Sequence, residues 1–254
     1  MLHLIRADIF RIIKSKGFYI TFGLLFLYLL VTVNFEIVGN VGVQDPNVPV
    51  DLPDIVWDVE HAIPVIASMS GLLVYFSLPL FIMIIGFDLS RNTYKNILTI
   101  GISRAKYFIS KSISFAILLI FQILCFYIVA CLLLGLKNGW GHLNFDFWQQ
   151  LFLVMGHQFL NIFAILSVTL IPLYLYSSNV SVVITTVVFP IIVSIVALIT
   201  KSEFVGYFDF SNVLSQTWNV DLSETFWIRN LIVIFLTIVI SHISSFIIFK
   251  RRSL

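Results

Sequence analysis

Charge is the scarcest property of this sequence. Only 11% of its 254 residues are charged, whereas 59% are hydrophobic, and the mean hydropathy is +1.03. A soluble domain carries about 25% charged residues and about 45–50% apolar ones. The composition therefore excludes a water-soluble globule and a disordered chain, and it is typical of a membrane protein with several spans.

Cysteine is almost absent as well. The two cysteines, Cys125 and Cys131, lie six residues apart in one apolar run, so on a helix they are separated by roughly 9 Å along the axis. A disulfide needs Cα atoms within about 7 Å of each other. The two thiols therefore cannot bridge, a disulfide scaffold is excluded, and we interpret both cysteines as small apolar helix residues.

The motifs of nucleotide, metal and hydrolase sites are also missing. The dipeptide Gly-Lys does not occur, so the chain has no GxxxxGK[ST] phosphate loop. Neither HExxH nor Cys-x-x-Cys is present, and there is no GxSxG elbow. We expect no catalytic residue, no metal ligand and no bound cofactor, so the chain is not predicted to be an enzyme.

Long runs without charge locate the membrane-spanning helices. A spanning helix needs about 20 mostly apolar residues. The runs predict six helices over residues 18–35, 64–87, 108–136, 150–176, 180–200 and 229–249. The polar stretch 176–179 divides the fourth from the fifth, Pro79, Pro172 and Pro190 predict kinks, and Pro64 is expected to open the second helix. The predicted fold class is an all-α integral membrane protein with one domain, residues 1–254.

The basic residues indicate the orientation. Twelve of the fifteen Lys and Arg residues lie in the N-terminal segment, around the loop between the second and third spans, or at the C-terminus. Eleven of the thirteen acids lie on the other side, all except Asp8 and Asp88. Because cytoplasmic loops are enriched in Lys and Arg, we expect both termini in the cytoplasm. The acidic first outer loop, 36–61, contains no cation.

Polar residues inside the predicted spans are few. Apart from Lys111 just inside the third span, we find no lysine or carboxylate there, which disfavours an ion-coupled carrier. The neutral or weakly basic residues are Gln122, His157, Gln158, Asn161 and His242. Hydrogen bonding between helices is their ordinary role, and a place on a transport pathway is the alternative for Gln122, His157 and Asn161.

The first 17 residues predict a helix that lies in the membrane interface. Leu2, Ile5, Ile9, Ile12 and Ile13 fall in one arc of a helical wheel, with Asp8 elsewhere. Such a helix buries its apolar face among lipid headgroups and holds basic residues near anionic lipid. Its predicted interfacial residues are Arg6, Ile9, Arg11 and Lys14, and Gly17 is expected to let the chain turn into the first span.

The loop 88–107 predicts a short helix on the cytoplasmic side. Tyr94, Ile97 and Leu98 form an i, i+3, i+4 apolar face. Gly101 suits the end of this helix, and Ser103 suits the N-cap of the third span. We expect the apolar face to be exposed, and an exposed face of this kind needs the membrane or a protein partner.

These two segments carry a resemblance to a known family. With the six-helix count, residues 6–16 and 92–111 make the chain similar to permease subunits of type-2 ABC transporters. The likeness covers the whole chain by layout, but it holds residue by residue only over 88–111, and the long acidic loop 36–61 departs from the pattern. It implies that the first segment is a connecting helix and that 201–227 is an outer helical hairpin near an exit gate. It also implies a coupling helix that docks on an ATPase through Thr93, Tyr94, Lys95, Ile97, Leu98, Gly101 and Arg104.

The resemblance further implies what the chain would do. Two copies of a separate ATP-binding subunit, which carry the ATP and magnesium, would drive this chain and a second permease protomer in the plasma membrane of a bacterium. Short permeases of this kind often export peptides or amphipathic toxins, as in lantibiotic immunity or cytolytic-peptide secretion. No nucleic-acid partner is expected. The alternatives are an ion-coupled secondary carrier and a non-transporting membrane immunity or scaffold protein, and the substrate and direction of transport stay open.

The charge distribution gives a topology that can be tested by labelling. In a background without Cys125 and Cys131, single cysteines at Asn47, Gly139 and Ser211 should react with an impermeant maleimide added to intact cells. Cysteines at Lys14 and Thr99 should react only after the membrane is opened. Labelling of the last two in intact cells would contradict the orientation.

Overall fold

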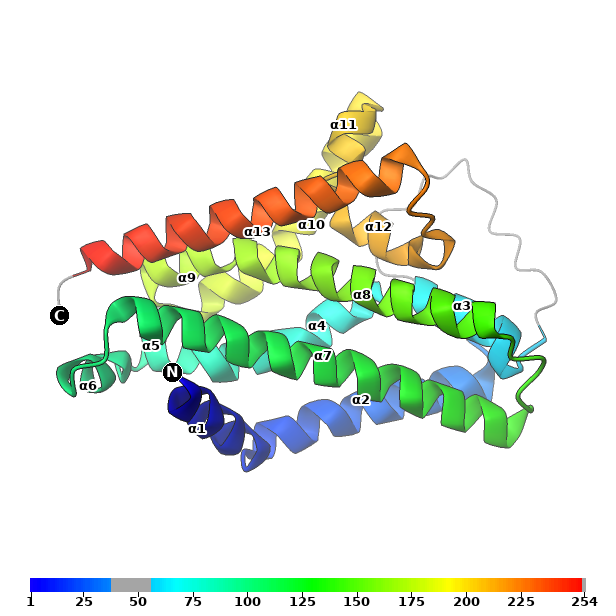
Figure 1. Cartoon of the computed structure of the whole chain (residues 1–254), viewed down its shortest axis with the longest axis horizontal. Coiled ribbons are helices and arrows are strands. Elements are labelled where there is room, and N and C mark those ends of the chain that lie inside the picture. Colours follow the sequence, from blue (N-terminus) through cyan, green and yellow to red (C-terminus); the bar gives the residue numbers. More distant parts are fainter. Residues whose placement is uncertain (38–55, 253–254) are drawn as a thin grey trace.

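A computed structural model describes residues 1–37 and 56–252. Within those residues every regular element is helical, as the predicted class requires. Six helical stretches are long and apolar enough to cross a membrane, and each predicted span overlaps one of them (Figure 1). The stretches are Lys16–Phe35, Gly71–Ser90, Arg104–Lys137, Phe145–Tyr176, Asn179–Thr200 and Thr225–Arg251.

The second span is preceded by a separate helix and contains a π-helical turn. The separate helix is α3 (Val59–Ser68). The span itself consists of α4 (Gly71–Phe81), the π-turn (Ile82–Gly86) and α5 (Phe87–Ser90). Pro64 lies inside α3, so the prediction that it opens the span is wrong. Asp58 begins α3 instead, because its carboxylate accepts the free N–H of His61. Pro79 lies just before the π-turn, as expected where a proline disturbs the hydrogen-bond ladder.

The third span confirms two helix-boundary predictions. The short helix α6 (Tyr94–Thr99) is followed by Gly101 with φ +94°, a left-handed conformation that suits glycine. Ser103 then caps α7 (Arg104–Lys137), where its side chain accepts a hydrogen bond from Lys106 N. With 34 residues, α7 is about 50 Å long and exceeds the thickness of a bilayer core.

The fourth and fifth spans divide where the polar stretch predicted. Their elements are α8 (Phe145–Val168), α9 (Leu170–Tyr176) and α10 (Asn179–Thr200). Ser177 adopts φ +53° after α9, and the Ser178 side chain accepts a hydrogen bond from Val180 N at the start of α10. Pro172 follows the break at Thr169, whereas α10 continues through Pro190.

The segment 201–227 folds back against the bundle. It contains α11 (Glu203–Gly206), α12 (Phe210–Ser215) and a 3-10 turn (Thr217–Asn219), and α13 (Thr225–Arg251) follows as the sixth span. Helix α12 packs on α3, α4, α8 and α10 and lies beside α8 in Figure 1. Two hydrogen bonds fix the segment, from Ser70 Oγ to Leu214 O at 3.0 Å and from Gln158 Nε2 to Thr217 Oγ1 at 2.9 Å.

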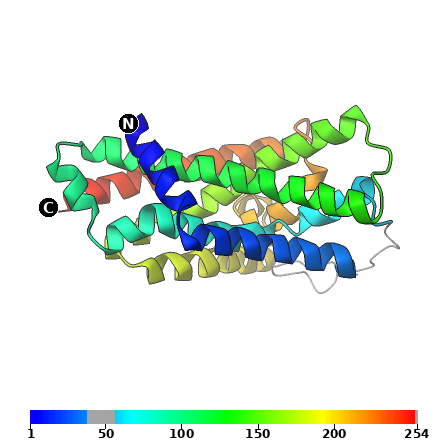
Figure 2. The same cartoon turned by 90° about the horizontal axis from the view of Figure 1, so that it is seen from below.

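Both termini lie at one end of the bundle, together with α1 (Leu2–Ile13) and α6 (Figure 1). The two termini share an end because the chain runs along the bundle six times, an even number. Because most of the Lys and Arg residues belong to segments at this end, we call it the basic end. Figure 2 shows α1 set at a steep angle to α2 (Lys16–Phe35), so that α1 lies across the bundle rather than along it.

The turn from α1 into α2 is made by Ser15. Its side chain accepts a hydrogen bond from Phe18 N at 3.2 Å and thereby caps α2. Gly17 is already helical and lies against Met83, where an added Cβ would approach the sulfur to 2.8 Å. The prediction that Gly17 makes the turn is therefore wrong, and its small size serves close packing instead.

The burial of the spans differs markedly. The second span is the most enclosed, while α10 and α13 are the most open. The open helices expose large apolar side chains such as Ile192 on α10 and Phe235 on α13. Exposed apolar surface of this extent is compatible with lipid or with another membrane protein, but not with water.

Gly86 permits a close approach between the second and fifth spans. It is the last residue of the π-turn, and a Cβ added to it would collide with the side chain of Asn179 at the start of α10. The Asn179 side chain also donates a hydrogen bond to Ser90 Oγ at 3.3 Å. The two spans are therefore joined at the basic end through a contact that requires glycine.

We predict that Gly86→Val destabilises the protein by about 1–3 kcal/mol, because overpacking at a close contact displaces its neighbours. Gly23→Val is the control, since a Cβ at Gly23 meets nothing within 4 Å. The measurement is the denaturation midpoint in mixed detergent–SDS micelles. Equal midpoints for the two variants would contradict the close contact.

Candidate functional site

Four charged side chains meet inside the basic end, and we call them the charge cluster. Lys111 Nζ of α7 lies 2.6 Å from Asp8 Oδ1 of α1 and 2.5 Å from Asp88 Oδ2 of α5. Arg11 Nη1 donates to Asp88 Oδ1 at 2.8 Å, and its Nη2 lies 3.4 Å from Asp8 Oδ1. The side chains of Lys111 and Asp88 are only 3% and 5% exposed. The cluster therefore joins α1 to the second and third spans.

The charges of the cluster compensate one another. Two carboxylates face two cations, which is what burial of charge in a low dielectric requires. Partial burial acts to lower the pKa of Arg11, but its hydrogen bond to Asp88 and the charges of Asp88 and Asp8 outweigh this and raise the pKa. Arg11 therefore stays positively charged at any physiological pH.

The cluster corrects two expectations from the sequence. Asp8 is on the buried side of α1 with Ile5 and Ile12, not on its polar side, because it pairs with Lys111. The spans also contain a buried lysine–carboxylate pair, Lys111 with Asp88, where carboxylates were expected to be absent. The sequence contained a signal for the charge cluster. Asp8 and Asp88 are the two acids on the cation-rich side, and Lys111 is the cation that lies furthest into a span.

The remaining surface of α1 exposes apolar and basic side chains. Leu2, Phe10 and Ile13 are exposed, while Ile9 is half-buried. Lys14 Nζ lies 4.5 Å from the centre of the Phe10 ring. Of the four predicted interfacial residues, Arg6 and Lys14 are thus exposed, Ile9 is half-buried, and Arg11 belongs to the charge cluster. The predicted apolar arc is divided between the bundle and the exposed side.

Helix α6 turns its apolar face toward the protein, not outward. Tyr94 is only 3% exposed, and its ring packs on Phe249 of α13 with centroids 5.6 Å apart. Ile97 and Leu98 are half-buried against the same core. The expectation of an exposed apolar face is therefore wrong, because Phe249 of α13 supplies apolar surface that the isolated sequence lacked.

Two polar contacts fix the segments on either side of α6. The Thr93 hydroxyl donates to Asp88 Oδ1 at 3.2 Å and so joins α6 to the charge cluster. Arg104 Nη1 donates to the carbonyls of Phe249, Lys250 and Arg252 at 2.9, 2.7 and 2.8 Å, where it caps the end of α13. Helix α6 is thereby attached to three spans at once.

The outward side of α6 is polar with one large apolar residue. We call it the α6 surface, and it consists of Lys95, Asn96, Thr99 and Ile100. Ile100 is 81% exposed, whereas Lys95 is half-buried. Asn96, Thr99 and Ile100 are spaced i, i+3, i+4, opposite the buried face, so helical periodicity was the signal that could have identified them. Gly101 is also exposed beside this surface.

The predicted pathway residues lie deep in the bundle. Gln122 is buried and accepts a hydrogen bond from Ser77 Oγ at 3.0 Å. His157 and Asn161 share a hydrogen bond of 2.8 Å within α8, and the His157 ring packs edge-on to Trp227. These contacts show how the helices are held together, and the pathway role stays a prediction.

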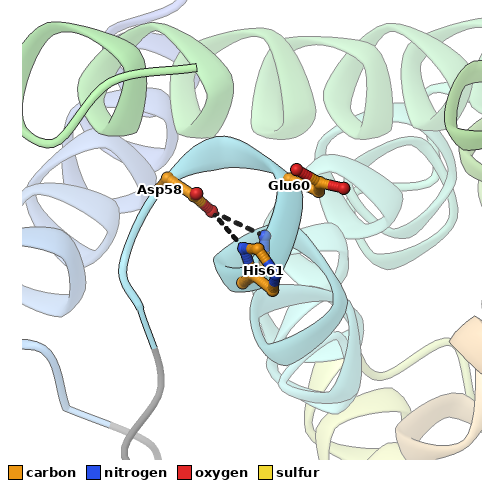
Figure 3. A group of neighbouring side chains, drawn as sticks. All are labelled: Asp58, Glu60 and His61. Carbon is orange, nitrogen blue, oxygen red and sulfur yellow. Dashed lines mark hydrogen bonds and ion pairs between the residues drawn. The ribbon is translucent and has the colours of Figure 1, made fainter. Parts of the chain in front are cut away.

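A group of three ionisable residues lies at the opposite end, at the start of α3 (Figure 3). Asp58 Oδ1 accepts hydrogen bonds from His61 N at 2.9 Å and from His61 Nδ1 at 2.7 Å. Glu60 Oε2 accepts one from His142 N at 2.7 Å. Burial raises the pKa of the Asp58 carboxyl, but hydrogen bonds and the charge of His61 outweigh burial and lower it. The group thus caps α3 and ties it to the 138–144 loop. Most of the acidic loop, including Asp45, Asp51 and Asp54, lies outside the described residues.

No family model matches the chain, and no curated protein matches it either. The geometry of the basic end therefore carries the functional interpretation.

We predict that Lys111→Met destabilises the protein by about 3–5 kcal/mol, because it leaves two buried carboxylates with a single cation. Adding Asp8→Asn should recover part of the loss, since Arg11 and Asp88 then remain as a neutral pair. The free energy of unfolding in SDS micelles is the measurement. Lys106→Met, on an exposed side of α7, is the control and should change it little. Equal effects at Lys106 and Lys111 would show that the cluster does not stabilise the fold.

Proposed function

We propose that this chain is the permease subunit of an ATP-driven transporter similar to the type-2 ABC family, with its basic end in the cytoplasm. The layout supports the proposal: six span-length helices, a short helix between the second and third, and an amphipathic helix before the first. The gathering of cations at the end that holds both termini supports the orientation.

The attachment of α6 is the observation that carries the proposal. Tyr94 packs on α13, Thr93 bonds to Asp88 of α5, and Arg104 bonds to the end of α13. A force on the α6 surface would therefore move the second, third and sixth spans together, as coupling between an ATPase and a pathway requires. The predicted residues Ile97 and Leu98 would contribute by holding α6, while the α6 surface and Gly101 would contact the partner.

The chemistry of the transport cycle belongs to other subunits in this proposal. Two copies of a separate ATPase would bind ATP and magnesium, since this chain has no phosphate loop. A second permease protomer, identical or not, would complete the pathway, and the exposed apolar sides of α2, α10 and α13 offer surface for it or for lipid. A peptide or amphipathic toxin is the proposed cargo, and segment 201–227 the proposed outer gate.

An ion-coupled carrier is the second candidate, because the charge cluster places ionisable groups within two spans. Both carboxylates of the cluster are paired with cations, however, which favours a structural role. Substrate uptake into vesicles driven by an ion gradient in the absence of ATP would select the carrier. A non-transporting immunity or scaffold protein would keep its function after its ATPase is deleted.

The α6 surface gives a direct test. A photo-reactive amino acid at Ile100 should crosslink to a polypeptide with a GxxxxGK[ST] motif in native membranes, because Ile100 is 81% exposed beside the proposed docking site. The control is the same probe at Leu136, which is 83% exposed at the other end of α7. Mass spectrometry of the crosslinked bands identifies the partner.

Ile100→Asp should then reduce co-purification of that ATPase at least tenfold, while the fold is retained because the residue makes little contact with the bundle. Leu136→Asp should leave co-purification unchanged. If Ile100 captures no ATPase, or if both variants lose it equally, α6 does not couple this chain to an ATPase.

A further inference from the structure

A cavity of about 320 Å³ opens at the basic end between α1, the π-turn and the segment that leads into α6. It contacts the charge cluster through Arg11 and Asp88, but the proposed α6 surface does not line it. Its lining combines two arginines and two hydroxyls with apolar walls. The polar residues are Arg11, Arg91, Ser15, Thr93 and Asp88, and the apolar ones are Ile12, Met83, Phe87 and Ile97.

The cavity carries a positive charge that the protein leaves available. Within residues 1–37 and 56–252, no carboxylate lies within ion-pair distance of Arg91. Its guanidinium lies 4.9 Å from the centre of the Phe87 ring, which holds it against the cavity wall. Asp88 does not cancel this charge, because Lys111 and Arg11 already compensate Asp88 and Asp8. The three cations and two carboxylates leave one positive charge.

The position of the cavity indicates where its ligand comes from. Exposed apolar side chains of α1, among them Phe10 and Ile13, place this helix against the membrane surface. The cavity begins on the same helix at Arg11 and ends at Phe87, which is 38% exposed on the second span. It therefore lies where the headgroup layer meets the hydrocarbon.

We propose that this cavity binds the phosphodiester headgroup of an anionic glycerophospholipid. Arg91 and the outer edge of Arg11 would contact the phosphate oxygens, for which guanidinium is the best-matched side chain. Ser15 and Thr93 would face the headgroup, and Met83 and Phe87 the start of the acyl chains. Basic pockets between spans on the cytoplasmic side bind anionic headgroups by this chemistry. The proposal does not depend on the transport function.

The test is a lipid titration of the purified full chain in detergent, followed by native mass spectrometry. Phosphatidylglycerol should bind more tightly than phosphatidylcholine of the same acyl chains. Arg91→Gln should weaken phosphatidylglycerol binding about fivefold, the effect of one basic residue near an anionic headgroup, and should leave phosphatidylcholine unchanged. Arg251→Gln is the matched control, because Arg251 is exposed at the end of α13 and does not line the cavity.

A second variant distinguishes a specific loss of lipid binding from misfolding of the protein. Arg91→Lys keeps the charge but loses the paired donors, so its affinity should fall between those of the wild type and Arg91→Gln. Equal losses in Arg251→Gln and Arg91→Gln, or no preference for phosphatidylglycerol, would overturn the site. If inorganic phosphate binds the lipid-free protein more tightly than phosphatidylglycerol does, the ligand is a free anion and the lipid assignment is wrong.

Discussion

Two carboxylates and Lys111 are withdrawn from water at the basic end beside the half-exposed Arg11, and the arrangement of that end depends on their pairing. An unpaired buried charge costs several kcal/mol, so each of the three buried groups must keep a partner. Lys111 meets this condition only when Asp8 of α1 and Asp88 of α5 approach it together. The charge cluster therefore sets the rotation of α1 about its axis and the height of the second span against the third.

The placement of α6 follows from this arrangement. Asp88 accepts a hydrogen bond from the Thr93 hydroxyl, and Arg104, five residues after the end of α6, donates to the last carbonyls of α13. Between these two anchors, Tyr94 is buried against Phe249. The short helix, which would be unstable alone, thus becomes a rigid projection with a polar outer side. That rigidity is what makes a coupling role physically reasonable.

Neutral hydrogen bonds join helices in the opposite half of the molecule, beside ion pairs such as Lys137 with Glu36. Ser70 bonds to the carbonyl of Leu214, Gln158 bonds to Thr217, and Gln150 bonds to the carbonyl of Trp218. Neutral hydrogen bonds join helices in an apolar environment without the desolvation penalty of a charge. These bonds fix α12 and its neighbours against α8.

The sequence alone determined the six spans, the division near Ser177 and the caps around α6, because hydrophobic run length and local backbone preference act over a few neighbouring residues. It also predicted which segments gather the cations. Only the tertiary structure decided that Asp8 faces inward and that Tyr94 packs on α13. A helical wheel shows which residues share a face, but whether that face meets water, lipid or protein depends on partners about 80 to 155 residues away in the chain, and no local pattern encodes them.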